Sequence, residues 1–62
     1  MLENNINKDF LTIQDLSTLY SLSKEMQNKY RMQKKIPYIK IGKKIFYEKE
    51  RIKEWFLSHR IN

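Results

Sequence analysis

One face of a predicted helix carries basic and amide side chains and no acid. On a helical wheel of about 100° per residue, the residues of this face in the segment 24–35 are Lys24, Gln27, Asn28, Arg31 and Lys35. Lys and Arg can neutralise phosphates, and Arg, Asn and Gln can bond two atoms of a guanine or adenine edge in the major groove. A solvated surface is the ordinary interpretation of such a face. The short turn before the helix and the absence of Asp and Glu from the face instead favour contact with a nucleic acid.

Three lysines in a predicted hairpin, Lys40, Lys43 and Lys44, form a second basic surface. They can also protect an exposed strand edge, because lysine discourages pairing between sheets, and the two roles are compatible. Tyr38 and Phe46 are expected on the outer face of the hairpin beside these lysines. Exposed aromatic side chains usually cover something, here a partner, the N-terminal arm or the sugar edges of a groove.

The remaining residues exclude most catalytic and metal chemistry. The chain has no cysteine and a single histidine, His59, so neither a thiolate metal site nor an imidazole cluster can form. Carboxylates such as Glu48, Glu50 and Glu54 are interleaved with basic residues on a short helix and make no paired-acid or Ser-His-Asp arrangement. We therefore expect no enzyme, no metal site and no cofactor.

A short helix is predicted to begin at Ile13. Thr12 and Asp15 fit a capping box, and Leu11 and Leu16 fit the hydrophobic staple that accompanies one. The apolar stripe expected to be buried on this helix comprises Ile13, Leu16, Leu19 and Tyr20.

A second helix is predicted over 24–34, directly after a tight turn. Ser23 is a good N-cap for it, and Leu22 is expected to point inward from the turn. Pro37 marks the expected end, because its ring also disfavours helical geometry at the residue before it. The opposite side of this helix carries Met26, Tyr30 and Gln33, and Met26 and Tyr30 are expected in the core.

The segment 36–47 is rich in β-branched and aromatic residues and contains the only glycine, Gly42, which predicts a β-hairpin. Two registers compete. A two-residue turn of the II′ type at Gly42-Lys43 would put Lys44 on the same face as Ile39 and Ile41. A three-residue loop would align Ile39, Ile41, Ile45 and Tyr47 on one face and Tyr38, Lys40 and Phe46 on the other. We favour the three-residue loop.

A final helix is predicted over 48–59, with Ile52, Trp55 and Phe56 facing the core and His59 exposed near its end. The order helix, turn, helix, hairpin, helix gives an α+β, mostly helical fold. Residues 1–9 are expected to be a flexible N-terminal arm, and residues 10–62 a single domain.

Composition agrees with a small soluble domain that binds a polyanion. The 62 residues include 13 Lys and Arg against 7 Asp and Glu, a formal charge of +6, and 40% are apolar. No apolar run approaches the roughly 18 residues of a membrane span, and the N-terminus is unlike a signal peptide, so a cytoplasmic protein without membrane contact is expected.

The chain resembles the excisionase-type winged helix-turn-helix DNA-binding domains that are related to the MerR regulators. The resemblance runs from Phe10 to about His59. It is carried by Leu11-Thr12, Ser23, Ile36-Pro37, Lys40-Ile41-Gly42-Lys43-Lys44 and Glu54-Trp55, which match the family pattern in order and spacing.

This resemblance implies binding to double-stranded DNA, with the second helix in the major groove and the hairpin, or wing, on the backbone or minor groove. By position, the implied DNA-binding residues are Ser23, Lys24, Gln27, Asn28 and Arg31 on the helix and Lys43 and Lys44 on the wing; the basic surfaces described above add Lys35 and Lys40. The implied role is an accessory excision factor or a small transcriptional regulator of a mobile element, with a recombinase or neighbouring copies on DNA as further partners. The alternative is a protein-interaction module that uses Tyr38 and Phe46. A monomer is expected in free solution.

Overall fold

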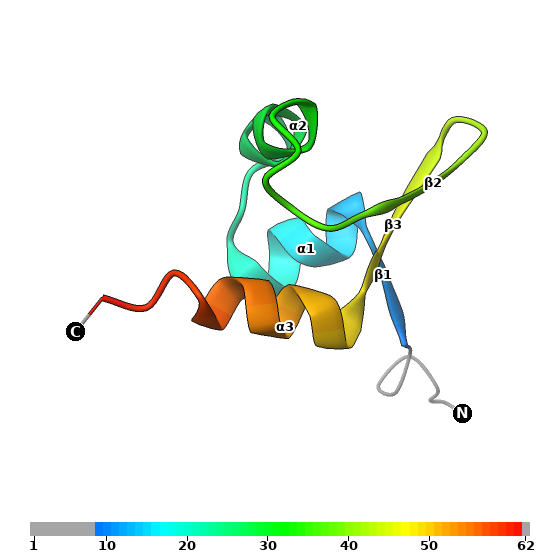
Figure 1. The fold of residues 1–62 in the computed structure, drawn as a ribbon. Helices are drawn as coiled ribbons and strands as arrows, with labels where there is room; N and C mark the ends of the chain where they lie inside the picture. Colours follow the sequence, from blue (N-terminus) through cyan, green and yellow to red (C-terminus); the bar gives the residue numbers. More distant parts are fainter. Residues whose placement is uncertain (1–8, 62) are drawn as a thin grey trace.

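Three helices and a three-stranded antiparallel sheet make up residues 9–61, the part of the chain that this computed structural model describes (Figure 1). In chain order the elements are β1 (Phe10–Thr12), α1 (Ile13–Tyr20), α2 (Lys24–Met32), β2 (Ile39–Ile41), β3 (Lys44–Glu48) and α3 (Lys49–Leu57). This arrangement confirms the expected α+β winged helix-turn-helix architecture. The hairpin of β2 and β3 is the wing. Apart from Asp9, the arm predicted over 1–9 lies outside the described residues.

The start of α1 confirms the predicted capping box. The Thr12 hydroxyl accepts a hydrogen bond from the Asp15 N–H at 3.1 Å, and the Asp15 carboxylate accepts one from the Thr12 N–H at 3.0 Å. Both residues predicted for the staple, Leu11 and Leu16, are buried. Leu19, expected in the same stripe, is instead 65% exposed because the short helix buries a narrower face than its apolar residues could cover.

Strand β1 has no counterpart in the sequence-based interpretation. It pairs with β3, so the strand order is β1-β3-β2, with Leu11 opposite Tyr47. Next to this ladder the Asp9 carbonyl accepts a hydrogen bond from the Lys49 N–H at 2.9 Å. Three residues are too few to show an alternating pattern, and only a partner strand distinguishes them from a loop.

The wing closes with a two-residue turn, so the favoured three-residue loop is wrong. Ile41 pairs with Lys44 and Ile39 with Phe46, which leaves Gly42 and Lys43 as the turn. Gly42 has φ +61°, which is the positive value that a II′ turn requires at its first central residue. This turn matches the right-handed twist of the two strands.

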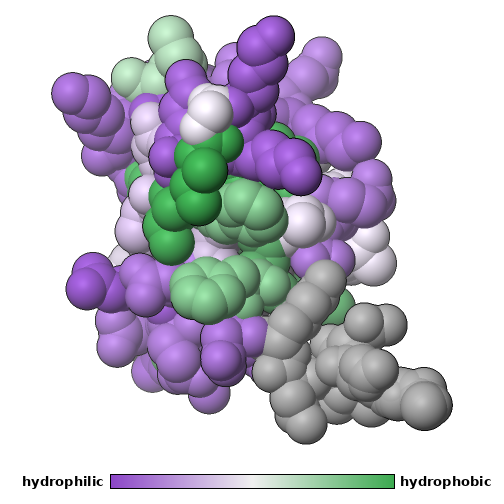
Figure 2. Space-filling view, turned by 90° about the vertical axis from the view of Figure 1, so that its right-hand side faces the viewer, coloured by the Kyte–Doolittle hydropathy of each residue, from purple (hydrophilic) through white to green (hydrophobic). Residues whose placement is uncertain are grey.

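The corrected register changes which side chains share a face of the sheet, because a shift of one residue reverses every side chain of a strand. Ile45 and Tyr47 face the helices, whereas Ile39 and Ile41 lie with Phe46 on the opposite face. Phe10 of β1 lies on that second face too, through its pairing with Glu48. Figure 2 shows apolar side chains gathered along this part of the molecule, with hydrophilic ones on both sides.

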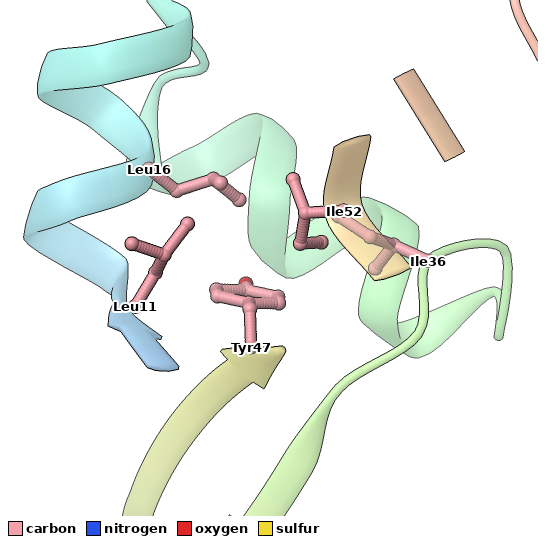
Figure 3. Packing of buried hydrophobic residues seen from close by; sticks show 5 residues of the cluster. All are labelled: Leu11, Leu16, Ile36, Tyr47 and Ile52. Atoms are coloured by element: carbon pink, nitrogen blue, oxygen red, sulfur yellow. The ribbon is translucent and has the colours of Figure 1, made fainter. Parts of the chain in front are cut away.

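Five buried apolar residues, which come from β1, α1, the segment before β2, β3 and α3, form the core. Figure 3 shows the Tyr47 ring standing among them, and all are at most 3% exposed: Leu11, Leu16, Ile36, Tyr47 and Ile52. Leu22 packs against this cluster as predicted. Trp55 is half-buried at its margin, and its indole Nε1 donates to the Lys35 carbonyl at 2.6 Å. Phe56, expected in the core, is 45% exposed, and its ring meets that of Tyr20 edge-on.

Helix α2 ends by a Schellman motif rather than at Pro37. The Lys35 N–H donates to the Tyr30 carbonyl at 2.8 Å, and the Lys34 N–H to the Arg31 carbonyl at 3.0 Å. Lys34 takes the left-handed position of the motif with φ 56°. Glycine favours this position because a Cβ atom is crowded there. Lysine provides no such sequence signal, so the predicted end of the helix lies beyond the observed one.

Candidate nucleic-acid interface

Helix α2 is capped at its N-terminus as predicted, and Ser23 is the cap. Its hydroxyl oxygen accepts a hydrogen bond from the Met26 N–H at 3.1 Å. The residue is exposed, so the hydroxyl proton remains available to a phosphate oxygen. Ser23 thus lies at the surface where the chain enters α2.

Gln27, placed by the sequence on the nucleic-acid face, is fully buried. Its Nε2 donates to the Leu22 carbonyl at 3.0 Å and to the Ile13 carbonyl at 3.1 Å, and its Oε1 accepts from the Tyr47 hydroxyl at 3.0 Å. These bonds join α2 to the start of α1, to the turn between the helices and to β3. Gln27 therefore holds the fold together and cannot reach a base.

The buried side of α2 is consequently rotated from the predicted side toward Gln27. The rotation is smaller than one residue position, about 100°, because Tyr30 belongs to both sides. Met26, expected in the core, is 44% exposed, and Gln33 is an exposed C-cap residue. Tyr30 packs against the core as predicted, with its ring 5.7 Å from that of Trp55. The apolar pattern of the helix favours Met26 in the core and Gln27 on the surface. Here three hydrogen bonds make the opposite choice favourable.

Arg31 lies between the core and the surface. It is half-buried, and its Nη1 donates to the Tyr47 hydroxyl. Burial raises the pKa of Tyr47 above the ordinary tyrosine value, while the hydrogen bond from Arg31 and the positive charge of Arg31 offset part of that rise. Tyr47 therefore stays protonated at neutral pH and can donate to Gln27 while it accepts from Arg31.

A hollow of about 340 Å³ separates α2 from the wing, and we call it the helix-wing hollow. Asn28 and Arg31 of α2 line it on one side, and their side chains approach each other, with Nη2 3.5 Å from Oδ1. Lys40 and Lys43 of the wing line it as well, together with Tyr38. The structure thus assembles four predicted site residues from two elements around one depression.

A second hollow, of about 510 Å³, contains the other wing lysine. Lys44 lines it together with Lys24, the first residue of α2, and with Phe46. The two lysines at the wing tip, Lys43 and Lys44, therefore line different hollows. Neither hollow has an Asp or Glu among the described residues that line it.

Lys35 lines neither hollow. Its backbone is held by the Schellman bond at the end of α2 and by the Trp55 indole, while its side chain is exposed. The aromatic pair expected on one outer face is also separated, because Tyr38 lines the helix-wing hollow and Phe46 lines the second hollow.

The sequence did not indicate that the Tyr47 hydroxyl bonds two residues of α2, Gln27 and Arg31. It assigned Tyr47 to the apolar face of the hairpin, where it is indeed buried, but gave its hydroxyl no partner. A buried tyrosine hydroxyl needs a hydrogen-bond partner, and that rule is the one signal that could have pointed toward Gln27 and Arg31. Gln27 lies 20 residues and Arg31 16 residues from Tyr47, which is outside any local pattern.

Over residues 9–61, the chain has no group of three or more His, Cys, Asp or Glu side chains placed to hold a metal ion. None of its helices is long and apolar enough to cross a membrane.

Comparison with known proteins gives one match. A family model described as a helix-turn-helix domain matches residues 10–60. No curated protein and no solved structure matches the chain significantly.

Proposed function

Because the chain belongs to the helix-turn-helix domain family, a DNA-binding and non-enzymatic kind of domain, we propose that it binds double-stranded DNA and prefers particular sequences. Helix α2 would enter the major groove, which accommodates an α-helix. The wing would lie along the adjoining backbone.

One observation carries the proposal: five cationic side chains line the two hollows beside the wing, without a carboxylate among the described lining residues. They are Lys24, Arg31, Lys40, Lys43 and Lys44. A carboxylate would repel phosphate, whereas this arrangement attracts it from both sides of the wing.

Base recognition is proposed for Asn28 and Arg31. Asn28 is exposed, and Arg31 reaches the same hollow from the next turn of the helix. Both side chains can form two hydrogen bonds with one base edge, Asn with adenine and Arg with guanine. The lysines, with Ser23, would contact phosphate and supply affinity without sequence choice.

Selection of preferred duplexes from a random pool, followed by titration at several salt concentrations, tests the proposal. We expect an enriched motif and a logarithmic salt dependence with a slope between about −3 and −5, since each neutralised phosphate contributes about −0.9. Binding without an enriched motif would reject sequence preference. If the protein binds no duplex even at low salt, the proposed DNA-binding function is rejected.

For the biological role we propose an accessory excision factor or a small transcriptional regulator of a mobile element, in line with the resemblance described above. The two roles differ in where the preferred duplex occurs. A site beside a recombinase attachment sequence favours excision, and a site that overlaps a promoter favours regulation. Footprinting on the DNA that surrounds the gene distinguishes them.

The protein-interaction alternative receives less support. It needs Tyr38 and Phe46 on one surface, and they line different hollows. Capture of a protein partner that is insensitive to salt, without duplex binding, would restore it.

A further inference from the structure

Arg31 differs from every other basic residue in the described part of the chain. It is half-buried, while each of the other Lys and Arg side chains over residues 9–61 is exposed. Its Nη1 bonds the hydroxyl of a residue that is itself completely buried, Tyr47. A surface arginine anchored to a core side chain has lost much of its rotamer freedom in the free protein.

The hydrogen bonds that connect Gln27, Tyr47 and Arg31 allow only one assignment of donors and acceptors. The Ile13 and Leu22 carbonyls can only accept, so they require the Nε2 of Gln27. Its Oε1 then faces Tyr47 and accepts the single hydroxyl proton, at 3.0 Å. The Tyr47 oxygen can then only accept a further hydrogen bond, so its remaining partner has to be a donor. Arginine has donors only and stays protonated, so it suits this position.

The Tyr47 ring has little room to move. It stands on β3 among Leu11, Leu16 and Ile52, all of which are at most 2% exposed (Figure 3). The hydroxyl is therefore held at a constant position relative to α2, and it bonds the guanidinium of a residue that lines the helix-wing hollow.

The bonds to Tyr47 and Asn28 use two of the five N–H groups of Arg31. Among the described residues the other three have no acceptor, and they remain for a base edge or phosphate. A side chain that is already ordered loses less conformational entropy on binding than a free one.

We infer that Tyr47 is a positioning residue for DNA recognition: through its hydroxyl it orders the Arg31 guanidinium in the helix-wing hollow before DNA arrives. The inference rests on the proposed function and adds to it a core residue that never touches DNA. It also gives a role to the series of hydrogen bonds in this small core, in which Gln27 orients Tyr47 and Tyr47 orients Arg31.

The first test is Tyr47→Phe, which removes one oxygen and keeps the ring. Affinity for the preferred duplex should fall about threefold to tenfold, in line with the cost of immobilising one long side chain. Affinity for random duplex should change by less than about twofold and the salt slope should stay the same, because the Arg31 charge is retained. Ile52→Val, in the same core but outside the hydrogen bonds, controls for a modest loss of packing.

A double-mutant cycle separates positioning from stability. In an Arg31→Met background, Tyr47→Phe should change affinity for the preferred duplex by less than about 1.5-fold, because the group that it positions is gone. Titrations are made at a temperature where circular dichroism shows every variant folded. An equal loss in both backgrounds would mean that Tyr47 acts only on the fold, and would overturn the inference.

A measurement on the free wild-type protein does not depend on the folding of any variant. Nitrogen relaxation should show the Nε–H group of Arg31 to be ordered, with an order parameter near that of the rigid backbone, about 0.85. The exposed Arg51 and Arg60 supply the mobile comparison. Equal mobility of all three would overturn the inference.

The outcomes distinguish the two proposals. If the wild-type protein binds no duplex, the proposed function fails, and the inference fails with it. If the wild-type protein selects a motif and Tyr47→Phe selects and binds it equally well, only the inference fails.

Discussion

Replacing Gln27 with alanine should destabilise the fold strongly rather than alter which DNA sequence the protein prefers. The side chain is fully buried and makes three hydrogen bonds, two to backbone carbonyls and one with Tyr47. At about 1 kcal/mol net for each bond, their loss amounts to about 3 kcal/mol, and the cavity adds to it. A domain of this length has a total unfolding free energy of about 3–9 kcal/mol.

Urea unfolding followed by circular dichroism measures the effect. With an m-value of about 1 kcal/mol/M for so small a protein, the midpoint should fall by about 3 M. Asn28→Ala, at the exposed neighbouring position, is the matched control and should stay within about 0.5 kcal/mol of the parent.

A second variant separates the cavity from the hydrogen bonds. Gln27→Leu fills much of the space but leaves the Ile13 and Leu22 carbonyls without their donor. It should therefore retain most of the loss of stability. If Gln27→Ala unfolds at the parental urea concentration and instead loses the preferred DNA motif, the residue faces DNA and our assignment of the buried side of α2 is wrong.

Four further predictions follow from the same structure. Lys34→Gly should raise the unfolding free energy by about 1 kcal/mol and the Tm by about 5 °C, since it relieves a left-handed conformation at φ 56°; Lys29→Gly, inside α2, should lower both, and the opposite ranking in thermal unfolding would contradict the Schellman assignment. Alanine at both Lys43 and Lys44 should weaken binding to preferred and random duplexes alike and reduce the salt slope by about 1 per lost phosphate contact; an unchanged slope would mean that the wing tip points into solvent. Because burial raises the pKa of Tyr47 in the folded state, its contribution to stability is fully present below the ordinary tyrosine pKa of about 10 and is lost as the pH rises above it; Tyr47→Phe should remove that part of the decline in urea midpoints between pH 9 and 11. Sedimentation at micromolar concentration should show a monomer in the absence of DNA, and a stable dimer would redirect attention to the apolar face of the sheet.

The sequence by itself determined the features that depend on neighbours along the chain. The start of α1 follows from Thr12 and Asp15, and the start of α2 from Ser23. A cap satisfies N–H groups within three residues of itself, so its energy is local and its signal is readable. The same holds for the wing as an element, since Gly42 lies between two runs of β-branched and aromatic residues.

The wing register was decided between two local alternatives by the rest of the fold. Both registers place Ile45 and Tyr47 on one face of the wing. The observed two-residue turn puts Ile39 and Ile41 on the opposite face, while Leu11 pairs with Tyr47 across β1 and β3. Strand β1 itself depends entirely on β3, because three residues have no stable strand conformation without a partner.

Tertiary structure alone decided which side of α2 is buried. The apolar pattern favours burial of Met26, and the structure buries Gln27. The free energy of burying an apolar side chain depends on its own surface, which a sequence states directly. The free energy of burying an amide depends on whether acceptors and donors meet it, and here these come from α1, the turn and β3. Because those partners lie far away in the sequence, the pattern of α2 could not indicate that Gln27 is buried and bonded to Tyr47.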